Sequence, residues 1–143
     1  MVEIALVLLI AGLLFGMLRP AYVHIIDEKS SDEATDEIRK IGSSIDQFYK
    51  DNGRYPDSLD EIFNPVPLDP WGNPYQYLNI KDYPSKSKGN LRKDKNLVPI
   101  NSDYDLYSMG PDGKSATPLT ANISHDDIVR GRNGLFVGVA SKY

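Results

Sequence analysis

The apolar run at the start of the chain is the feature that most constrains its fold. Residues 4–18 read IALVLLIAGLLFGML and contain no charged side chain. As a helix this segment rises about 22 Å, against roughly 30 Å for the hydrocarbon core of a bilayer. It is therefore short for a membrane span. With Met1 and Val2 added it could just cross a bilayer, with the Arg19 side chain reaching the headgroup layer.

Three interpretations of this run are open: a signal peptide, a plain membrane anchor, or a helix that packs among copies of itself. A signal peptide would have a basic segment before the run and small residues at a cleavage site after it. Here Glu3 precedes the run. A carboxylate near a membrane segment is costly unless paired, and the terminal amine of a neighbouring copy could pair with it. Gly12 and Gly16 have the G-x-x-x-G spacing that lets helices approach closely.

A second helical pattern follows Pro20. Apolar residues recur at steps of four and three, at Ala34, Ile38, Ile41, Ile45 and Phe48. This stripe predicts an amphipathic helix. We expect helix from the start to about Lys50, ended by residues 51–53, and a rod of roughly 75 Å whose first half projects. Pro20 predicts either a kinked or melted stretch within residues 12–21 or a bend in a continuous helix.

The rest of the chain predicts a small sheet. We expect a short helix at residues 57–63, and strands at 75–78, 104–108 and 135–139. The predicted fold class is α+β: a long N-terminal helix with an antiparallel sheet of about three strands laid on its apolar stripe. The predicted division is into residues 1–26, a membrane or filament-core helix, and residues 27–143, which hold the amphipathic half, the strands and the C-terminal loop.

Composition excludes several functions. The chain has no cysteine, so disulfides, thiolate metal sites and cysteine nucleophiles are excluded. Because the formal net charge is −4, we do not expect the chain to bind nucleic acid non-specifically. His24 and His125 lie far apart in the sequence, and no nucleophile motif is present. We therefore expect no enzyme and no nucleic-acid partner, and we expect the turn at residues 69–72 to determine the fold rather than to act in catalysis.

Several motifs together resemble a known family. They are Glu3 followed by Pro20 seventeen positions later, Asn-Gly-Arg-Tyr-Pro at 52–56, Asp-Pro-Trp-Gly-Asn-Pro-Tyr at 69–75, Asp-Leu-Tyr-Ser-Met-Gly-Pro-Asp-Gly at 105–113 and Asp-Asp-Ile at 126–128. Over nearly the whole chain they resemble the major pseudopilin of type II secretion systems, within the type IV pilin-like superfamily. The acid is the third residue here but the fifth in the family, so we expect two residues to be missing at the start; the alternative is an unusual mature N-terminus. The stretch between Asp112 and Asp126 is also longer than the family loop.

The resemblance implies a structural subunit that polymerises through its N-terminal helix. Before assembly the helix would lie in the bacterial inner membrane, with the rest of the chain in the periplasm. It would then join a helical homopolymer in the periplasm or at the cell surface. Implied partners are an inner-membrane assembly platform, minor pseudopilins and a prepilin peptidase that cleaves and methylates the chain. Glu3, Gly12, Gly16 and Pro20 would serve assembly. Alternatives are a surface fibre of the type IV pilus kind and a membrane-tethered calcium-binding module that never polymerises.

The resemblance also implies one bound Ca²⁺, with Asp112, Asp126 and Asp127 as the matching positions. Calcium takes six to eight oxygen ligands, and a small domain without disulfides gains stability from a metal. The alternative is that Asp112 occupies a Pro-Asp-Gly turn and that Asp126 and Asp127 cap a helical turn.

A basic loop is expected at residues 81–97, which hold six Lys and Arg residues. Residues 27–37 are rich in Asp and Glu. Opposite patches on one chain suit a repeating contact between copies. The alternative is two unrelated solvated surfaces.

Overall fold

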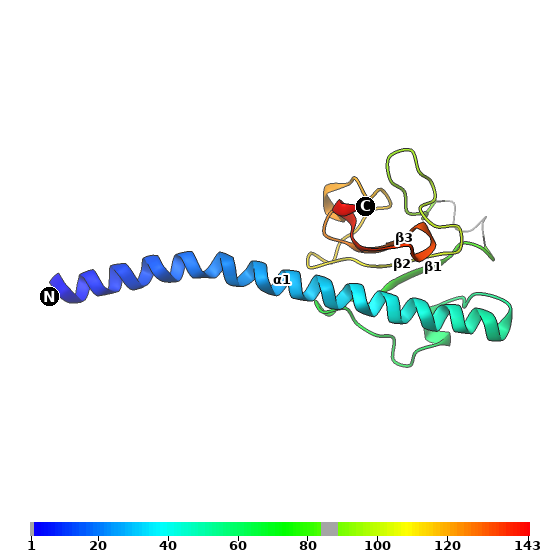
Figure 1. Ribbon diagram of the computed structural model, residues 1–143, viewed down its shortest axis with the longest axis horizontal. Coiled ribbons are helices and arrows are strands. Elements are labelled where there is room, and N and C mark those ends of the chain that lie inside the picture. Colours follow the sequence, from blue (N-terminus) through cyan, green and yellow to red (C-terminus); the bar gives the residue numbers. More distant parts are fainter. Residues whose placement is uncertain (1, 84–88) are drawn as a thin grey trace. The chain divides into compact units, whose positions relative to one another are not determined.

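The first element is one long helix. The computed structural model describes residues 2–83 and 89–143, except for the side chains of residues 2, 3, 17–22 and 24. Within it α1 (Val2–Asn52) is unbroken (Figure 1). Gly53 ends the helix with a φ of 71°, and its N–H donates to the Tyr49 carbonyl at 2.8 Å. The predicted helix end is confirmed, and α1 continues through position 20 with no melted stretch.

The chain divides into two compact units, Met1–Ser30 and Ser31–Tyr143. We call the first the N-terminal unit and the second the head. The boundary falls inside α1, so one helix contributes residues to both units. The division after residue 26 expected from the sequence stays a prediction.

The head contains one antiparallel sheet with strands in the order β1-β2-β3-β4. Its strands are β1 (Gln76–Asn79), β2 (Tyr104–Ser108), β3 (Ile128–Gly131) and β4 (Phe136–Val139). The α+β fold class is confirmed, but the expected number of strands was too low because β3 was missed. All four residues of β3 are buried, including Arg130. A strand buried on both faces lacks the alternation of apolar and polar residues that reveals a half-exposed strand.

The predicted apolar stripe forms the core of the head. Ala34, Ile38 and Ile45 are fully buried, and they belong to one cluster with residues of β2 and β3. Figure 1 shows the sheet alongside the C-terminal part of α1. Each buried aliphatic side chain contributes roughly 1.5–3 kcal/mol through removal of apolar surface from water. The stripe therefore secures this part of α1 to the sheet.

The loops are less regular than expected. The helix predicted at 57–63 is a single 3-10 turn, Leu59–Glu61, whose preceding residue Ser58 makes no side-chain cap. A second, smaller core contains Ile100, Leu119, Val129 and Ala140, of which Leu119 lies between β2 and β3. The long stretch from β2 to β3 is thus packed rather than free.

Candidate functional site

The N-terminal unit presents an apolar surface to its surroundings. The large apolar side chains that the structure describes in it are 44–79% exposed: Ile4, Leu6, Val7, Leu8, Leu9, Ile10, Leu13, Leu14, Phe15, Val23, Ile25 and Ile26. Contiguous exposed apolar surface of this kind marks a site of contact with protein or membrane. Within the unit, the described residues leave this surface open.

The predicted assembly residues lie in this unit. Apart from the nearby backbone of the helix itself, a β-carbon at Gly12 or Gly16 would meet no described atom within 4 Å, so no packing among the described residues requires glycine there. The side chains of Glu3 and Pro20 lie outside the described part of the structure. The assembly role of these four residues stays a prediction. Among the described residues, no helix has an apolar stretch long enough to cross a bilayer.

The turn at residues 69–75 is organised around a buried carboxylate. Asp69 is 4% exposed, and its Oδ1 accepts hydrogen bonds from the backbone N–H groups of Trp71, at 3.1 Å, and Asn73, at 2.8 Å. Its Oδ2 accepts from the Ser108 hydroxyl on β2 at 2.5 Å. The carboxylate thus fixes the turn and ties it to the sheet, which is a structural role and leaves no free acid for chemistry.

Three of the motifs meet at Gly110. Its carbonyl accepts from the Asn73 side chain at 3.3 Å. Its φ is 65°, and a β-carbon there would lie 2.5 Å from the backbone oxygen of Asp126. Only glycine fits both the conformation and the close approach. The motifs at 69–75, 105–113 and 126–128 therefore form one structural unit.

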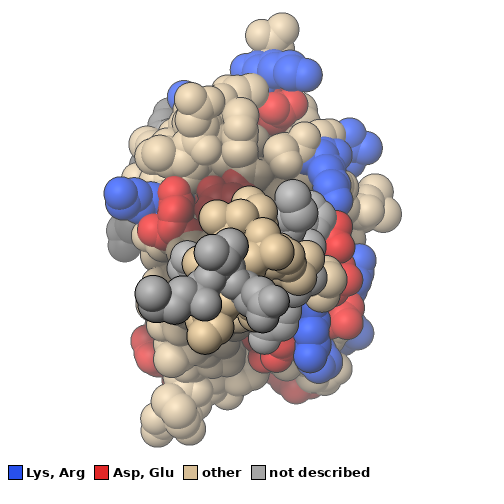
Figure 2. Space-filling view, turned by 90° about the vertical axis from the view of Figure 1, so that its left-hand side faces the viewer, with Lys and Arg blue, Asp and Glu red and all other residues tan. Residues whose placement is uncertain are grey.

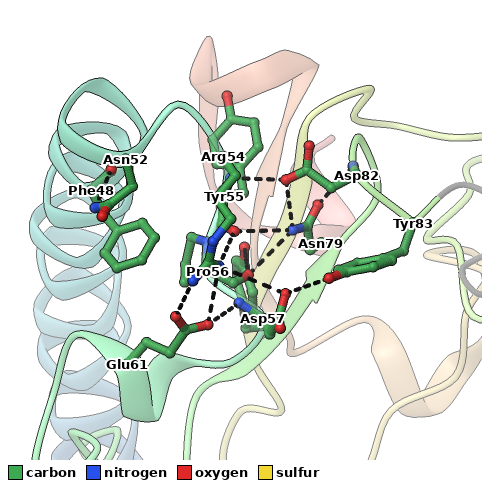
Figure 3. Close-up of polar contacts among 11 residues, drawn as sticks. Phe48, Asn52, Arg54, Tyr55, Pro56, Asp57, Glu61, Asn79, Asp82 and Tyr83 are labelled. Atoms are coloured by element: carbon green, nitrogen blue, oxygen red, sulfur yellow. Dashed lines mark hydrogen bonds and ion pairs between the residues drawn. The ribbon is translucent and has the colours of Figure 1, made fainter.

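The motif at residues 52–56 also secures the fold. Figure 3 shows it crossing from the end of α1 toward β1. The Tyr55 N–H donates to the Asp82 carboxylate at 2.8 Å, and the Arg54 guanidinium pairs with Glu61 at 2.7 Å. The chain reversal after α1 is thus held by polar contacts with Asp82 after β1 and with Glu61 in the 3-10 turn.

The three aspartates predicted to bind calcium are in three different settings. Asp112 is exposed, and its Oδ1 accepts from the Lys114 N–H at 2.8 Å, as in the Pro-Asp-Gly turn alternative. Asp126 is half-buried. Asp127 is fully buried, and its Oδ2 accepts from Arg92 at 2.6 Å. Within residues 2–83 and 89–143, no three His, Asp or Glu side chains come together to hold a metal ion. The carboxylates present therefore do not form the expected ligand group, and calcium binding stays a prediction.

The basic residues of the loop at 81–97 do not all lie at the surface, as their composition had suggested. Arg92 is buried, and Lys81 donates to the Tyr49 hydroxyl at 2.8 Å with its ammonium 4.4 Å from the ring centre. Lys86 and Lys88 lie outside the described residues. Figure 2 shows Lys and Arg interspersed with Asp and Glu on the face that it displays. Arg92, one of the six basic residues counted in this loop, is therefore inside the head and not part of a basic surface.

Arg92 is the residue that sequence reasoning missed. It lies in a stretch of lysine, serine, glycine and asparagine residues, and no local pattern separates one buried cation from its neighbours. Its partner Asp127 has a perturbed acidity. Burial raises the pKa of the Asp127 carboxyl to about 6, while hydrogen bonds from Ser115 and Arg92 act in the opposite direction.

Comparison with curated proteins identifies the relatives of this chain. One is type II secretion system core protein G of Pseudomonas aeruginosa, 28% identical, with 80% of this chain and 82% of the relative covered. Proteins of the same name from Aeromonas hydrophila and Escherichia coli are 27% and 25% identical, with 82% of this chain and 84% and 83% of the relatives covered. The chain is similar to type II secretion system core protein G. No family profile matches it, and no solved structure is significantly similar.

The resemblance predicted from the motifs is therefore confirmed. Core protein G is named as a component of a secretion system, and four such relatives match. The expectation that the chain is not an enzyme is confirmed on the same ground.

Proposed function

We propose that the chain is a pseudopilin of a type II secretion system and polymerises through α1 into a helical pseudopilus. The observation that carries this proposal is the apolar surface of the N-terminal unit, where large side chains are exposed on all sides of the helix between Ile4 and Phe15. A helix that is apolar on all sides needs lipid or several neighbouring helices around it. In a filament, copies of α1 supply those neighbours.

The same surface suits two successive environments. Before assembly, residues 4–18 lie in the inner membrane with the head in the periplasm, and an assembly platform then draws the helix into the filament. A prepilin peptidase processes and methylates the chain, and minor pseudopilins join the assembly. Gly12 and Gly16 permit close approach of neighbouring helices, and Glu3 pairs with the terminal amine of an adjacent copy.

Neutralising Glu3 tests the proposal. We expect Glu3→Gln to leave the chain in the membrane fraction but to abolish filaments, seen by electron microscopy of cells that also produce the secretion machinery. Glu33→Gln is the matched control, because Glu33 is exposed on the same helix. Filaments formed unchanged by Glu3→Gln would remove the pairing role. Wild-type chain that never forms filaments beside its machinery would favour the tethered module, and long surface filaments would favour the pilus-like fibre.

A further inference from the structure

Arg92 is a buried cation enclosed by oxygen atoms from the C-terminal loop. Its side chain is 2% exposed. One guanidinium nitrogen, Nη2, donates to Asp127 Oδ2 at 2.6 Å. The other, Nη1, donates to the Ala116 carbonyl at 2.7 Å and to the Ser115 hydroxyl. A carboxylate, a carbonyl and a hydroxyl thus surround one positive charge.

The backbone around Arg92 holds this cation in place. The Arg92 N–H donates to the buried Asp105 carboxylate at 3.0 Å, and its carbonyl accepts from the Ile100 N–H at 3.1 Å. The next residue, Lys93, exchanges backbone hydrogen bonds with the 117–119 segment. Arg92 is therefore fixed between β2 and the loop that its side chain reaches.

An aromatic ring completes the enclosure. The guanidinium carbon lies 4.2 Å from the centre of the Tyr107 ring. Stacking on an aromatic face and planar hydrogen bonding to oxygen are the interactions in which arginine differs from a metal ion or from lysine. The surroundings are thus suited to a guanidinium group.

We propose that Arg92 takes the position of the cation in the C-terminal loop, so that the head folds without calcium. The loop needs positive charge because the buried Asp127 carboxylate would otherwise be left unpaired. Arg92 supplies that charge from within the chain. Asp112, meanwhile, is engaged in its own turn at the surface.

Two buried atoms make a direct measurement of metal necessary. Arg92 Nε and Asp127 Oδ1 have no hydrogen-bond partner among the described residues. A carboxylate oxygen without a hydrogen-bond partner could accept a metal ion. Bound calcium should therefore be measured on the wild-type protein rather than inferred from variants.

The first experiment compares the full chain in detergent with and without calcium. Elemental analysis after dialysis against a chelator and return to calcium buffer should find no stoichiometric calcium. The melting temperature, followed by Trp71 fluorescence, should agree within about 1 °C in chelator and in millimolar calcium, since only a ligand that binds the folded state shifts it. One calcium per chain, or a rise of several degrees with calcium, would overturn the proposal.

The second experiment is a double-mutant cycle between Arg92→Ala and Asp127→Asn in the full chain. Arg92→Ala should lower the melting temperature by about 5 °C or more. Arg39→Ala, which alters an exposed arginine on α1, should barely change it. The folding equilibrium constant of the double variant should be at least about tenfold larger than the sum of the two single changes in free energy predicts. Additive effects, or an Arg92→Ala variant as stable as Arg39→Ala, would contradict the proposal. If a variant fails to fold, the wild-type calcium measurement still decides.

Discussion

The two parts of α1 carry similar apolar side chains but bury them differently. Ile38 and Ile45, in the head, are fully buried, whereas Ile4 and Ile25, in the N-terminal unit, are 67% and 64% exposed. Hydrophobicity does not explain the difference, because the same residue type occurs in both parts.

The spacing of the apolar residues explains it. In the head they form one stripe, which a single sheet covers from one side. In residues 4–18 they surround the helix, and no single element can cover all sides at once. A stripe can be buried within one chain, whereas a fully apolar helix needs lipid or other chains. The stripe in the head therefore stabilises the fold of a single chain, whereas the apolar surface of residues 4–18 is suited to contacts with lipid or other chains.

A matched pair of isoleucines tests this contrast with the largest expected effect. Ile38→Ala should lower the free energy of unfolding by about 3 kcal/mol, because it leaves a cavity in the core. Ile25→Ala should change it by less than about 0.5 kcal/mol. Urea unfolding of the full chain in detergent, followed by Trp71 fluorescence, measures both. Equal losses would show that the head depends on contacts made by the N-terminal unit.

The buried carboxylate of the 69–75 turn tests whether the head is stabilised from within. Asp69→Ala should cost about 2 kcal/mol, because Ser108 and two backbone N–H groups lose a charged acceptor. Asp60→Ala, at an exposed position, is the control and should be nearly neutral. Near-ultraviolet circular dichroism during urea unfolding measures both. A neutral Asp69→Ala would remove the turn from the account of the fold.

The pH dependence of stability can be tested in the head at the buried carboxyl of Asp127. The pKa of Asp127 is raised by burial to about 6, so the folded state retains a proton that the unfolded state releases near pH 4. The stabilisation from this proton is complete below pH 4 and is lost as the pH rises to about 6. The stability of wild type relative to Asp127→Asn should therefore fall over this interval in thermal melts. A relative stability that rises there would show that the ion pair with Arg92 outweighs burial.

The exposed ion pair beside the 52–56 motif should have the smallest effect. Arg54 and Glu61 are 48% and 30% exposed. Exposed pairs contribute at most about 1 kcal/mol and are weakened by salt. Glu61→Gln should therefore lower stability slightly at low salt and hardly at all at high salt. A large, salt-independent loss would mean that the chain reversal after α1 is as critical as the core.

Local patterns predicted much of the fold. The stripe from Ala34 to Ile45 identified the buried face of α1, and residues 51–53 identified its end. The strand at 104–108 was predicted with its observed bounds. These features depend on spacing within one segment, which a sequence displays directly.

Features that depend on distant contacts were missed. β3 escaped because Arg130 interrupts its apolar residues, and that arginine is buried beside Asp103, which pairs with it at 2.7 Å, and Tyr104, whose carbonyl accepts from it at 3.1 Å. Arg92 escaped because Asp127 lies 35 positions away. Nothing near either arginine in the sequence reveals a partner, so burial of the charge depends on tertiary structure.

Electron cryomicroscopy of the native assembly tests the central claim most directly. Filaments should be sheared from cells that produce the chain with its secretion machinery. The account predicts a helical filament in which residues 4–26 lie at the centre, packed against the same residues of neighbouring copies, with the heads outside. Chain recovered only from membranes, with no filament, or a filament whose centre is built from the heads would contradict it.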